Sequence, residues 1–267
     1  MWRLIDLKTV DGFTSASIFE AVGFFCSRGK APNTILFWRV NPPCVYVGYH
    51  QNVLDEVNVD ECKKRGVSIV RRILGGGSVY CDLNQLLYSI IVNVKHSNIP
   101  FSMQKAYKVL LKSVVLAFKK LGLLDAFYDE KLNAIIVNGK KISGNAGLQN
   151  GNLIMVNGSF LLDFDYKAMC KILRNPLKNL PGNPKNPEDG LTSIKRELKR
   201  YVDYEEAKKI LQTCFEEALN IQLFEDKLKI EELNLALKLN QKYKSKMWLY
   251  KFDLKHGKIS KNLLLES

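Results

Sequence analysis

The sequence predicts an α+β fold in which mixed β-sheets are flanked by helices. Short apolar, β-branched runs separated by turn signals fill most of the chain, for example 34–40 and 44–48 on either side of Asn41-Pro42-Pro43. Asn138-Gly139 and Asn150-Gly151 are typical hairpin turns within a predicted meander. Helical spacing of apolar residues is strongest in 100–121 and recurs in 204–219. This mixture of strands and separate helices indicates the α+β class.

The expected elements can be placed along the whole chain. A short helix at 59–65 has Asn58 as its expected N-cap and is stopped by Gly66. Residues 175–191 hold four prolines and are expected to form an irregular loop, either a lid or a mobile connection. Helices are expected on one side of the sheet, at 15–26, 59–65, 100–121, 166–173, 204–219 and 230–242. Strands are expected at 2–7, 34–40, 44–48, 67–70, 78–81, 86–94, 133–137, 141–144, 153–156, 159–163, 223–227 and 247–254.

Composition sets limits on the class of protein. The 267 residues carry 40 Lys plus Arg against 27 Asp plus Glu, an excess that attracts acidic partners or forms a solvated basic surface. No recognition helix or RNA-binding signature accompanies this charge, so nucleic acid is not an expected partner. No apolar run reaches the roughly 18 residues of a membrane span, and the N-terminus lacks a signal-peptide layout, so we expect no membrane and a cytoplasmic location. The six cysteines are scattered and are expected to be buried thiols.

Two glycine-rich stretches are the strongest candidates for a functional site. The first, Arg71-Arg72-Ile73-Leu74-Gly75-Gly76-Gly77-Ser78, follows a β-branched run, and its glycines could turn main-chain N–H groups toward an anion. Arg72 would add a fork of donors for phosphate or carboxylate. The second, 138–147, places Lys141 among small residues that leave room for a ligand. Each stretch taken alone could also be a structural turn, and neither has the P-loop or Rossmann spacing.

Taken together, these stretches resemble the signatures of the lipoate-protein ligase family. Residues 71–83 are similar to its Arg-Arg-x-Ser/Thr-Gly-Gly-Gly-x-Val-x-His-Asp-Leu signature, and 139–146 to its Gly-Lys-Lys-Ile-Ser-Gly-x-Ala signature. Trp38-Arg39 and the later 47–52 stretch match in order as well. The resemblance implies a biotin/lipoate ligase-like catalytic domain over 1–245, followed by a C-terminal tail at 246–267 of unassigned role.

The resemblance also implies a reaction. Such ligases use ATP with Mg²⁺ to convert lipoate to lipoyl-AMP, then transfer the lipoyl group to a lysine of a carrier domain. Lys141 is the expected catalytic residue, bridging carboxylate and phosphate, and apolar side chains of neighbouring strands are expected to line an acyl tunnel. The expected partners are acidic lipoyl domains of 2-oxoacid dehydrogenases or the glycine-cleavage H protein. The implied ATP- and substrate-binding residues are Arg72, Gly75, Gly76, Gly77, Ser78, Val79, Tyr80, Asp82, Asn133, Gly144 and Ala146.

Several positions depart from the family pattern and keep alternatives open. Ala134 stands where the family has an Asp expected near the adenylate and metal, and Asn157 and Cys81 replace histidines. The accessory C-terminal domain of longer members is not present in this chain, so a separate accessory subunit is a further expected partner. Octanoyltransferases of the superfamily carry the acyl group on a cysteine, and a Cys81 thiol beside Arg72 could have a lowered pKa. The alternatives are therefore an octanoyl or lipoyl transferase, or a non-catalytic lipoyl-binding relative.

Overall fold

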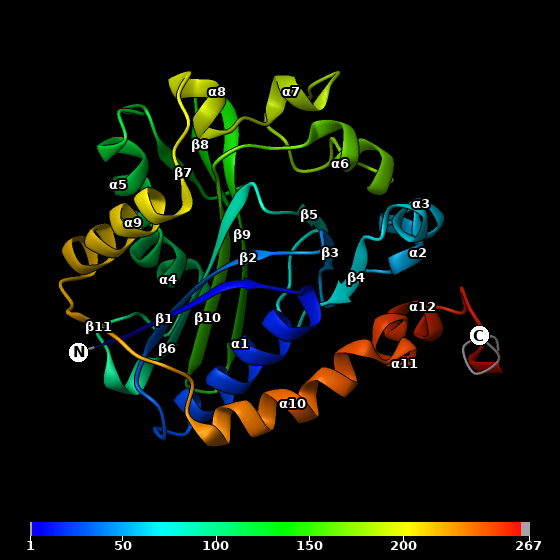
Figure 1. Ribbon diagram of the computed structural model, residues 1–267, viewed down its shortest axis with the longest axis horizontal. Coiled ribbons are helices and arrows are strands. Elements are labelled where there is room, and N and C mark those ends of the chain that lie inside the picture. The colour runs from blue at the N-terminus through cyan, green and yellow to red at the C-terminus, as the bar shows by residue number, and fades with distance from the viewer. Residues whose placement is uncertain (1, 263–267) are drawn as a thin grey trace.

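The computed structural model describes residues 2–262, and its centre is an eight-stranded mixed sheet (Figure 1). The strand order is β11-β1-β2-β6-β10-β9-β8-β7. Only β1 pairs in parallel, with β2 and with β11, and the other neighbours are antiparallel. The strands are β1 (Trp2–Val10), β2 (Thr34–Val40), β6 (Gln85–Asn93), β7 (Phe127–Asp129), β8 (Ala134–Val137), β9 (Lys140–Asn150), β10 (Leu153–Leu161) and β11 (Leu223–Glu225).

Helices cover both faces of this sheet, whereas the sequence analysis expected them on one. Alternation along β2 explains the difference, because Ile35 and Phe37 pack into one buried cluster while Leu36 and Trp38 pack into another. The first cluster lies under α4 (Met103–Leu110), α5 (Lys112–Lys120) and α9 (Tyr204–Leu219). The second lies under α1 (Gly12–Ser27) and α10 (Ile230–Lys244). No helix within residues 2–262 is both long and apolar enough to cross a membrane.

A smaller three-stranded sheet lies beside the large one. Its order is β4-β3-β5, with β3 (Cys44–Val47), β4 (Ser68–Arg71) and β5 (Val79–Cys81). The first glycine-rich stretch connects β4 to β5, and we call residues 72–78 the glycine loop. Short helices surround this sheet and the upper edge of the molecule in Figure 1. They are α2 (Val53–Glu56), α3 (Val59–Arg65), α6 (Tyr166–Ile172), α7 (Pro187–Gly190) and α8 (Ile194–Leu198), and a 3-10 turn, η1 (Val94–His96), follows β6.

Several predicted elements differ from the structure. The predicted helix 100–121 is two helices, α4 and α5, that meet at Leu111. The strands predicted at 153–156 and 159–163 are one continuous strand, β10, because Gly158 lies under the Tyr88 ring rather than in a turn. The strand predicted at 247–254 is wrong, since this segment forms α11 (Lys246–Leu249) and α12 (Lys251–Lys255). Its aromatic residues Trp248 and Phe252 are four apart and both contact the Tyr49 ring, which a helix permits.

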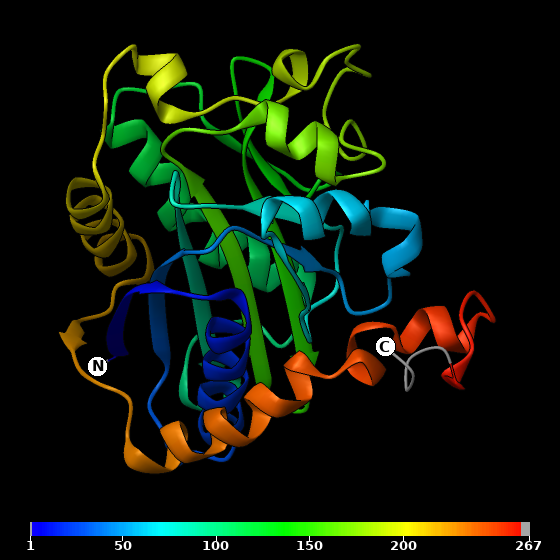
Figure 2. The same cartoon turned by 45° about the vertical axis from the view of Figure 1, so that its right-hand side comes forward.

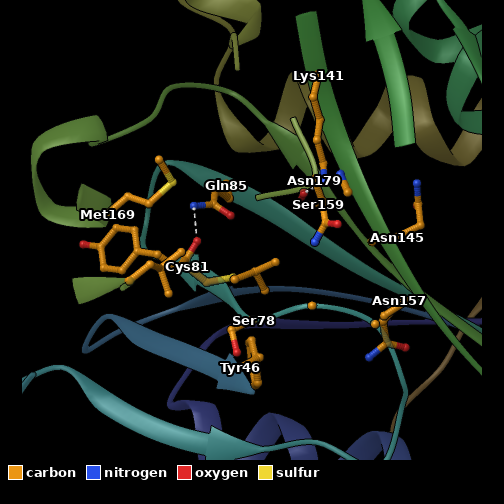
Figure 3. A pocket seen from close by; sticks show the side chains of 18 of the residues that line it. Tyr46, Ser78, Cys81, Gln85, Lys141, Asn145, Asn157, Ser159, Met169 and Asn179 are labelled. Atoms are coloured by element: carbon orange, nitrogen blue, oxygen red, sulfur yellow. Dashed lines mark hydrogen bonds between the residues drawn. The ribbon is translucent and has the colours of Figure 1, made fainter. Parts of the chain in front are cut away.

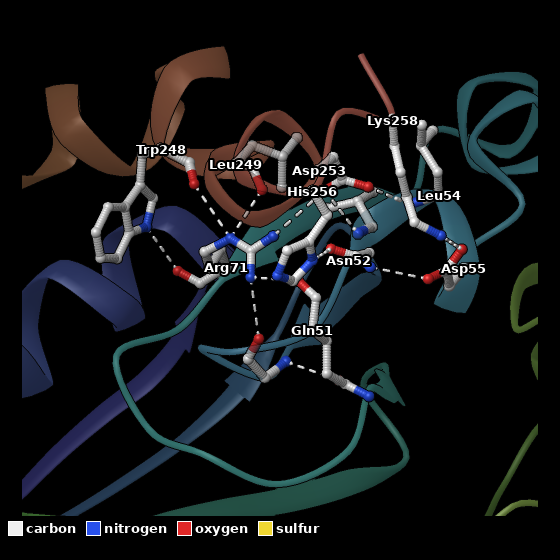
Figure 4. A network of polar contacts seen from close by, with 12 residues as sticks. Gln51, Asn52, Leu54, Asp55, Arg71, Trp248, Leu249, Asp253, His256 and Lys258 are labelled. Atoms are coloured by element: carbon white, nitrogen blue, oxygen red, sulfur yellow. Dashed lines mark hydrogen bonds and ion pairs between the residues drawn. The ribbon is translucent and has the colours of Figure 1, made fainter.

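The C-terminal helices are joined to the small sheet through Arg71, a buried side chain at the end of β4 (Figure 4). Its guanidinium donates to the carbonyls of Trp248 and Leu249 on one side. On the other side it donates to the carbonyls of Gly48, Tyr49 and Gln51. Residues 246–255, which the sequence analysis placed in a tail, therefore support the loop that follows β3. Figure 2 shows α10 running beneath α1 toward this contact.

Asp253 of α12 completes the connection. Its carboxylate lies 3.6 Å from Arg71 Nη2 and accepts hydrogen bonds from the Val53 and Leu54 N–H groups at the start of α2. Gln51, between these contacts, uses Oε1 to accept from Gly48 N–H and from the Ser78 hydroxyl of the glycine loop. A continuous polar network thus extends from the C-terminal helices to the glycine loop.

Candidate active site

One cavity of about 280 Å³ lies between the small sheet, α6 and the face of the large sheet that carries α1. Lys141 enters it from β9, and Tyr46 and Ser78 enter from the opposite side (Figure 3). The two glycine-rich stretches, separated in sequence by residues 79–137, therefore meet at one site. Of the predicted site residues, those lining the cavity are Arg72, Gly76, Gly77, Ser78, Val79, Tyr80, Cys81, Asn133, Lys141, Gly144 and Ala146.

A β-bulge determines where Lys141 points. Ser143 pairs with Ile135 and Lys141 pairs with Ile136, so Ile142 is an extra residue in β9. Strict alternation would place Lys141 on the same face as Ser143, and the extra residue turns it to the cavity instead. Gly144 makes room there, because a Cβ at that position would lie 3.3 Å from Lys141 Nζ.

The ammonium group of Lys141 has no acidic neighbour. It forms no ion pair with any residue among 2–262. Burial lowers the pKa of Lys141 from 10.5 to about 8, since the surroundings do not compensate the lost hydration of the charged form. An anion or a developing oxyanion at this end of the cavity would supply that compensation. Lys141 is therefore the strongest electrophilic candidate among the lining residues.

Arg72 holds the shape of the glycine loop. One guanidinium nitrogen donates to the Tyr46 carbonyl at 2.9 Å, and the other donates to the Gly75 and Gly77 carbonyls at 2.7 Å each. The side chain is 4% exposed, and burial lowers its pKa to about 10. Its two terminal nitrogens are used by main-chain carbonyls, while the buried Nε–H has no hydrogen-bond partner among the described residues. Arg72 thus acts first on the loop, where the sequence analysis expected a direct contact with phosphate or carboxylate.

The glycines themselves allow a close approach of two main chains. Gly76 has a φ of +87°, a conformation that favours glycine. Only glycine fits at position 48, directly after β3, because a Cβ there would lie 1.9 Å from the Gly76 carbonyl oxygen. Gly75 does not line the cavity, and its N–H donates to the Gly147 carbonyl of β9. This bond links the glycine loop to the strand that carries Lys141.

Asp82, like Gly75, is a predicted site residue that does not line the cavity. Its carboxylate accepts from the N–H of Asn84 at 2.8 Å, and it is buried behind β5. Burial raises its pKa. The carboxylate organises the turn into β6 and is not directed at a ligand.

Cys81 is the only cysteine that lines the cavity among the described residues. It is buried and lies directly opposite Cys44 in the β3–β5 pair. Burial raises the pKa of the thiol, and the nearby Asp82 raises it further, while Arg72 has the opposite and smaller effect. The expectation of a lowered pKa is therefore wrong. At neutral pH Cys81 is a protonated thiol, which is a poor nucleophile.

Residues at the two apolar walls were not singled out from the sequence. Phe19, Trp38 and Leu87 line the end near α1, where strand alternation on β2 and β6 could have indicated Trp38 and Leu87. Met169 of α6 and the 175–180 loop cover the other wall. The 175–180 part of this cover belongs to the segment that was expected to be a lid or connection, whereas Met169 lies in the predicted helix 166–173. Lys178 on it pairs with Glu56 of α2 at 2.9 Å.

The lining residues do not match the needs of ATP with Mg²⁺. Glu56 is the only carboxylate among the described lining residues, and Lys178 already pairs with it. Magnesium prefers carboxylate oxygens together with phosphate. Ala134, at the position of the expected acid, is a buried methyl on β8. The site thus presents a cation and an apolar pocket without the acid that a metal–nucleotide complex would use.

Comparisons with known proteins decide the family. The model of the lipoyl protein ligase A/B catalytic domain matches residues 16–216. The chain belongs to this family. It is 30% identical to octanoyltransferase LipM of Bacillus subtilis (strain 168) over 94% of this chain and 98% of that protein. It is equally similar, at 30% identity and the same coverage of both chains, to octanoyltransferase LipM of Geobacillus kaustophilus (strain HTA426).

Solved structures of lipoyl ligases share the fold of this family member. Lipoate-protein ligase A bound with ATP has a TM-score of 0.81 at 25% identity, covering 94% of this chain and 98% of that one. A bi-partite lipoate protein ligase from Thermoplasma acidophilum, solved with its E2 lipoyl domain, has a TM-score of 0.80 at 26% identity, covering 94% and 96%. These neighbours confirm the predicted α+β catalytic fold.

The predicted reaction needs correction. The relatives that match over nearly the whole chain are octanoyltransferases, which contradicts the prediction of an ATP-dependent lipoate ligase and favours the transferase alternative. The chain carries motifs that resemble a ligase signature and yet matches octanoyltransferases over nearly its whole length, so the motifs alone do not distinguish the two reactions. The comparisons support an enzyme of the lipoate ligase and transferase superfamily for this chain.

Proposed function

We propose that this protein is an acyltransferase that moves an octanoyl-type acyl group from a carrier thioester to a lysine amine of a lipoyl domain. The observation that carries the proposal is the cavity itself, in which an unpaired buried lysine faces an apolar pocket without a free carboxylate. Such a site suits an acyl chain whose carbonyl lies at the charged end. The identity to octanoyltransferases supports the choice of acyl group.

The chemistry follows from the position of Lys141. The acceptor amine, in its neutral form, attacks the thioester carbonyl, and a C–N bond forms while negative charge develops on the carbonyl oxygen. The Lys141 ammonium stabilises that oxyanion in a site with little water, where electrostatic stabilisation is strongest. The C–S bond then breaks, and the carrier leaves as a thiol after taking up the proton lost by the amine. No ATP is consumed in this sequence.

Cys81 forms part of the wall in this scheme and does not carry the acyl group. Its thiol is buried, and its raised pKa keeps it protonated at neutral pH. The transfer is therefore direct, from donor thioester to acceptor amine, without an acyl-enzyme. Replacing Cys81 with alanine should leave transfer within about threefold, since the cost is limited to a small change in packing.

The expected acceptors are acidic lipoyl domains of 2-oxoacid dehydrogenases or the glycine-cleavage H protein. The formal net charge of +13 favours association with acidic proteins. The structural description of a neighbouring bi-partite lipoate protein ligase together with its E2 lipoyl domain supports this class of partner. We also assign the protein to the cytoplasm, where such complexes would present their lipoyl domains.

The test supplies the purified protein with octanoyl carrier protein and an apo lipoyl domain, and follows the mass of the domain. The proposal expects an octanoyl adduct on its lysine without ATP. Lys141→Ala should lower the rate by at least 100-fold, on the scale of losing one oxyanion donor. Lys140→Ala is the matched control, because Lys140 precedes it on β9 and donates to the Glu188 carbonyl outside the cavity. An adduct that requires ATP and free acid, or no adduct under either condition, would overturn the proposal.

A further inference from the structure

A long stretch of the chain carries positive charge without any negative charge. Residues 83–124 contain six lysines, no aspartate and no glutamate. Five of these lysines lie on α4 and α5. The overall basic character of the protein is thus concentrated in part on two helices that cover one face of the large sheet.

Three of these lysines border a groove on the outer surface. Lys108, Lys112 and Lys119 line it, and they are spaced so that they follow one side of the α4–α5 pair. The remaining lining is mainly apolar, with Val115 and Leu116 on α5 and Ala126, Phe127 and Tyr128 at and beside β7. We call this feature the lysine groove.

The charge of the lysine groove is only partly neutralised within the molecule. Lys108 pairs with Glu130 at 2.7 Å, and both side chains are largely exposed. Lys112 and Lys119 form no ion pair with any residue among 2–262. Phe127 is 51% exposed at the edge of the sheet. An exposed aromatic ring between unpaired lysines is typical of a surface that binds a partner.

The lysine groove is connected to the active cavity through one tyrosine. Tyr128 lines the groove, and its hydroxyl donates to Asn133 Oδ1 at 2.8 Å. Asn133 lines the cavity, and its side-chain amide donates to the Asn145 carbonyl of β9. Because β7 is the edge strand of the large sheet, the groove lies around that edge from the cavity. Figure 1 shows α5 beside β7.

We propose that the lysine groove docks an acidic amphipathic helix of the carrier protein that brings the acyl thioester. The basic border would pair with acidic side chains while the apolar floor receives the apolar face of the helix, which is the helix-in-groove mode of recognition. This inference rests on the proposed transferase function. The partner is the donor rather than the lipoyl acceptor because the acyl group must travel from the groove to the cavity. A donor's long flexible arm can extend that far around the sheet edge. An acceptor lysine side chain is short and must be presented at the cavity itself.

The test uses the full-length double variant Lys112→Glu with Lys119→Glu. Its matched control is Lys209→Glu with Lys238→Glu, two exposed lysines on α9 and α10 that likewise make no ion pair with a described residue. The KM for octanoyl carrier protein should rise at least tenfold in the groove variant and less than twofold in the control. The KM for octanoyl-pantetheine, which lacks the protein part, should be unchanged in both.

The outcomes separate this inference from the proposed function. An unchanged KM for the carrier, or a rise only in the KM for the lipoyl domain, would overturn the groove assignment while leaving transfer intact. Binding of the apo carrier is measured in parallel by fluorescence anisotropy, so that the groove is tested even without turnover. If no thioester were turned over but the wild type bound the apo carrier and the groove variant did not, docking would be supported. The lack of turnover would then refute only the transferase proposal.

Discussion

Replacing Lys141 should stabilise the protein at neutral pH, and the size of the gain can be worked out. Burial lowers the pKa of this lysine from 10.5 to about 8. Below pH 8 both the folded and the unfolded state are protonated, so folding carries the full cost of burying the charge. The difference between the two pKa values corresponds to about 3 kcal/mol at pH 7. Lys141→Met has an unbranched side chain one atom shorter and removes the charge, so its free energy of unfolding should be higher by up to that amount.

The stability difference between Lys141→Met and the wild type should also decrease as the pH rises. Between pH 8 and 10.5 the unfolded wild-type chain binds more protons than the folded one, so the stability of the wild type rises with pH and approaches that of the variant. Urea denaturation of both proteins at pH 7 and pH 10 measures the two differences. A gain that is largest at pH 7 and small at pH 10 supports the argument. A destabilised variant, or the same difference at both pH values, would show that Lys141 is not held charged against a burial cost.

Three further predictions concern rate and architecture. The transfer rate should rise with pH up to about 8, as more of the acceptor amine becomes neutral, and level off above about 8, as Lys141 loses its proton; the residual activity of Lys141→Arg should keep rising there, since guanidinium stays charged. Asp253→Asn should lower the free energy of unfolding by about 3 kcal/mol, because it leaves the buried Arg71 without its carboxylate partner; a loss below 1 kcal/mol in urea would contradict this. Gly48→Ala should cost about 1–3 kcal/mol and most of the activity, because its Cβ would collide with Gly76 O; wild-type activity would contradict the close approach.

A surface ion pair on the same C-terminal segment provides the control for the Asp253 variant. Lys258 pairs with Asp55 at 2.5 Å, but both side chains are substantially exposed. Lys258→Ala removes an interaction between the same two parts of the chain and should cost less than about 1 kcal/mol. If both variants lost stability equally, the effect would come from detaching the segment rather than from the buried charge of Arg71.

The sequence was sufficient for those parts of the fold that depend on local signals. The helix 59–65, with Asn58 at its N-cap and Gly66 in the left-handed conformation at its end, forms as predicted. The segment 247–254 was predicted as a strand because its alternating apolar residues fit a period of two as well as a short helix. Tertiary contacts of Trp248 and Phe252 with Tyr49 favour the helix, and no local signal contains that information.

The candidate site was predictable in its components and not in its geometry. That Lys141 and the glycine loop meet follows from the shared motifs, but the bulge at Ile142 that turns Lys141 into the cavity depends on pairing between strands. The raised pKa of Cys81 also depends on burial among residues distant in sequence. Residue types indicated which groups could act. The structure determines which face of the sheet each group occupies and what surrounds it.

The glycine loop by itself does not distinguish a ligase from a transferase. Arg72 donates to the main-chain carbonyls of Tyr46, Gly75 and Gly77 and so holds the glycine loop, a role that either reaction can use. A nucleotide-dependent reaction needs in addition an acid for the metal, and the lining offers only Glu56, which is paired with Lys178. Thioester transfer needs only an oxyanion partner and an apolar pocket, which Lys141 and the wall near α1 supply. The choice between the two reactions therefore lies in the side chains that line the cavity beside Lys141, and these support the proposed thioester transfer.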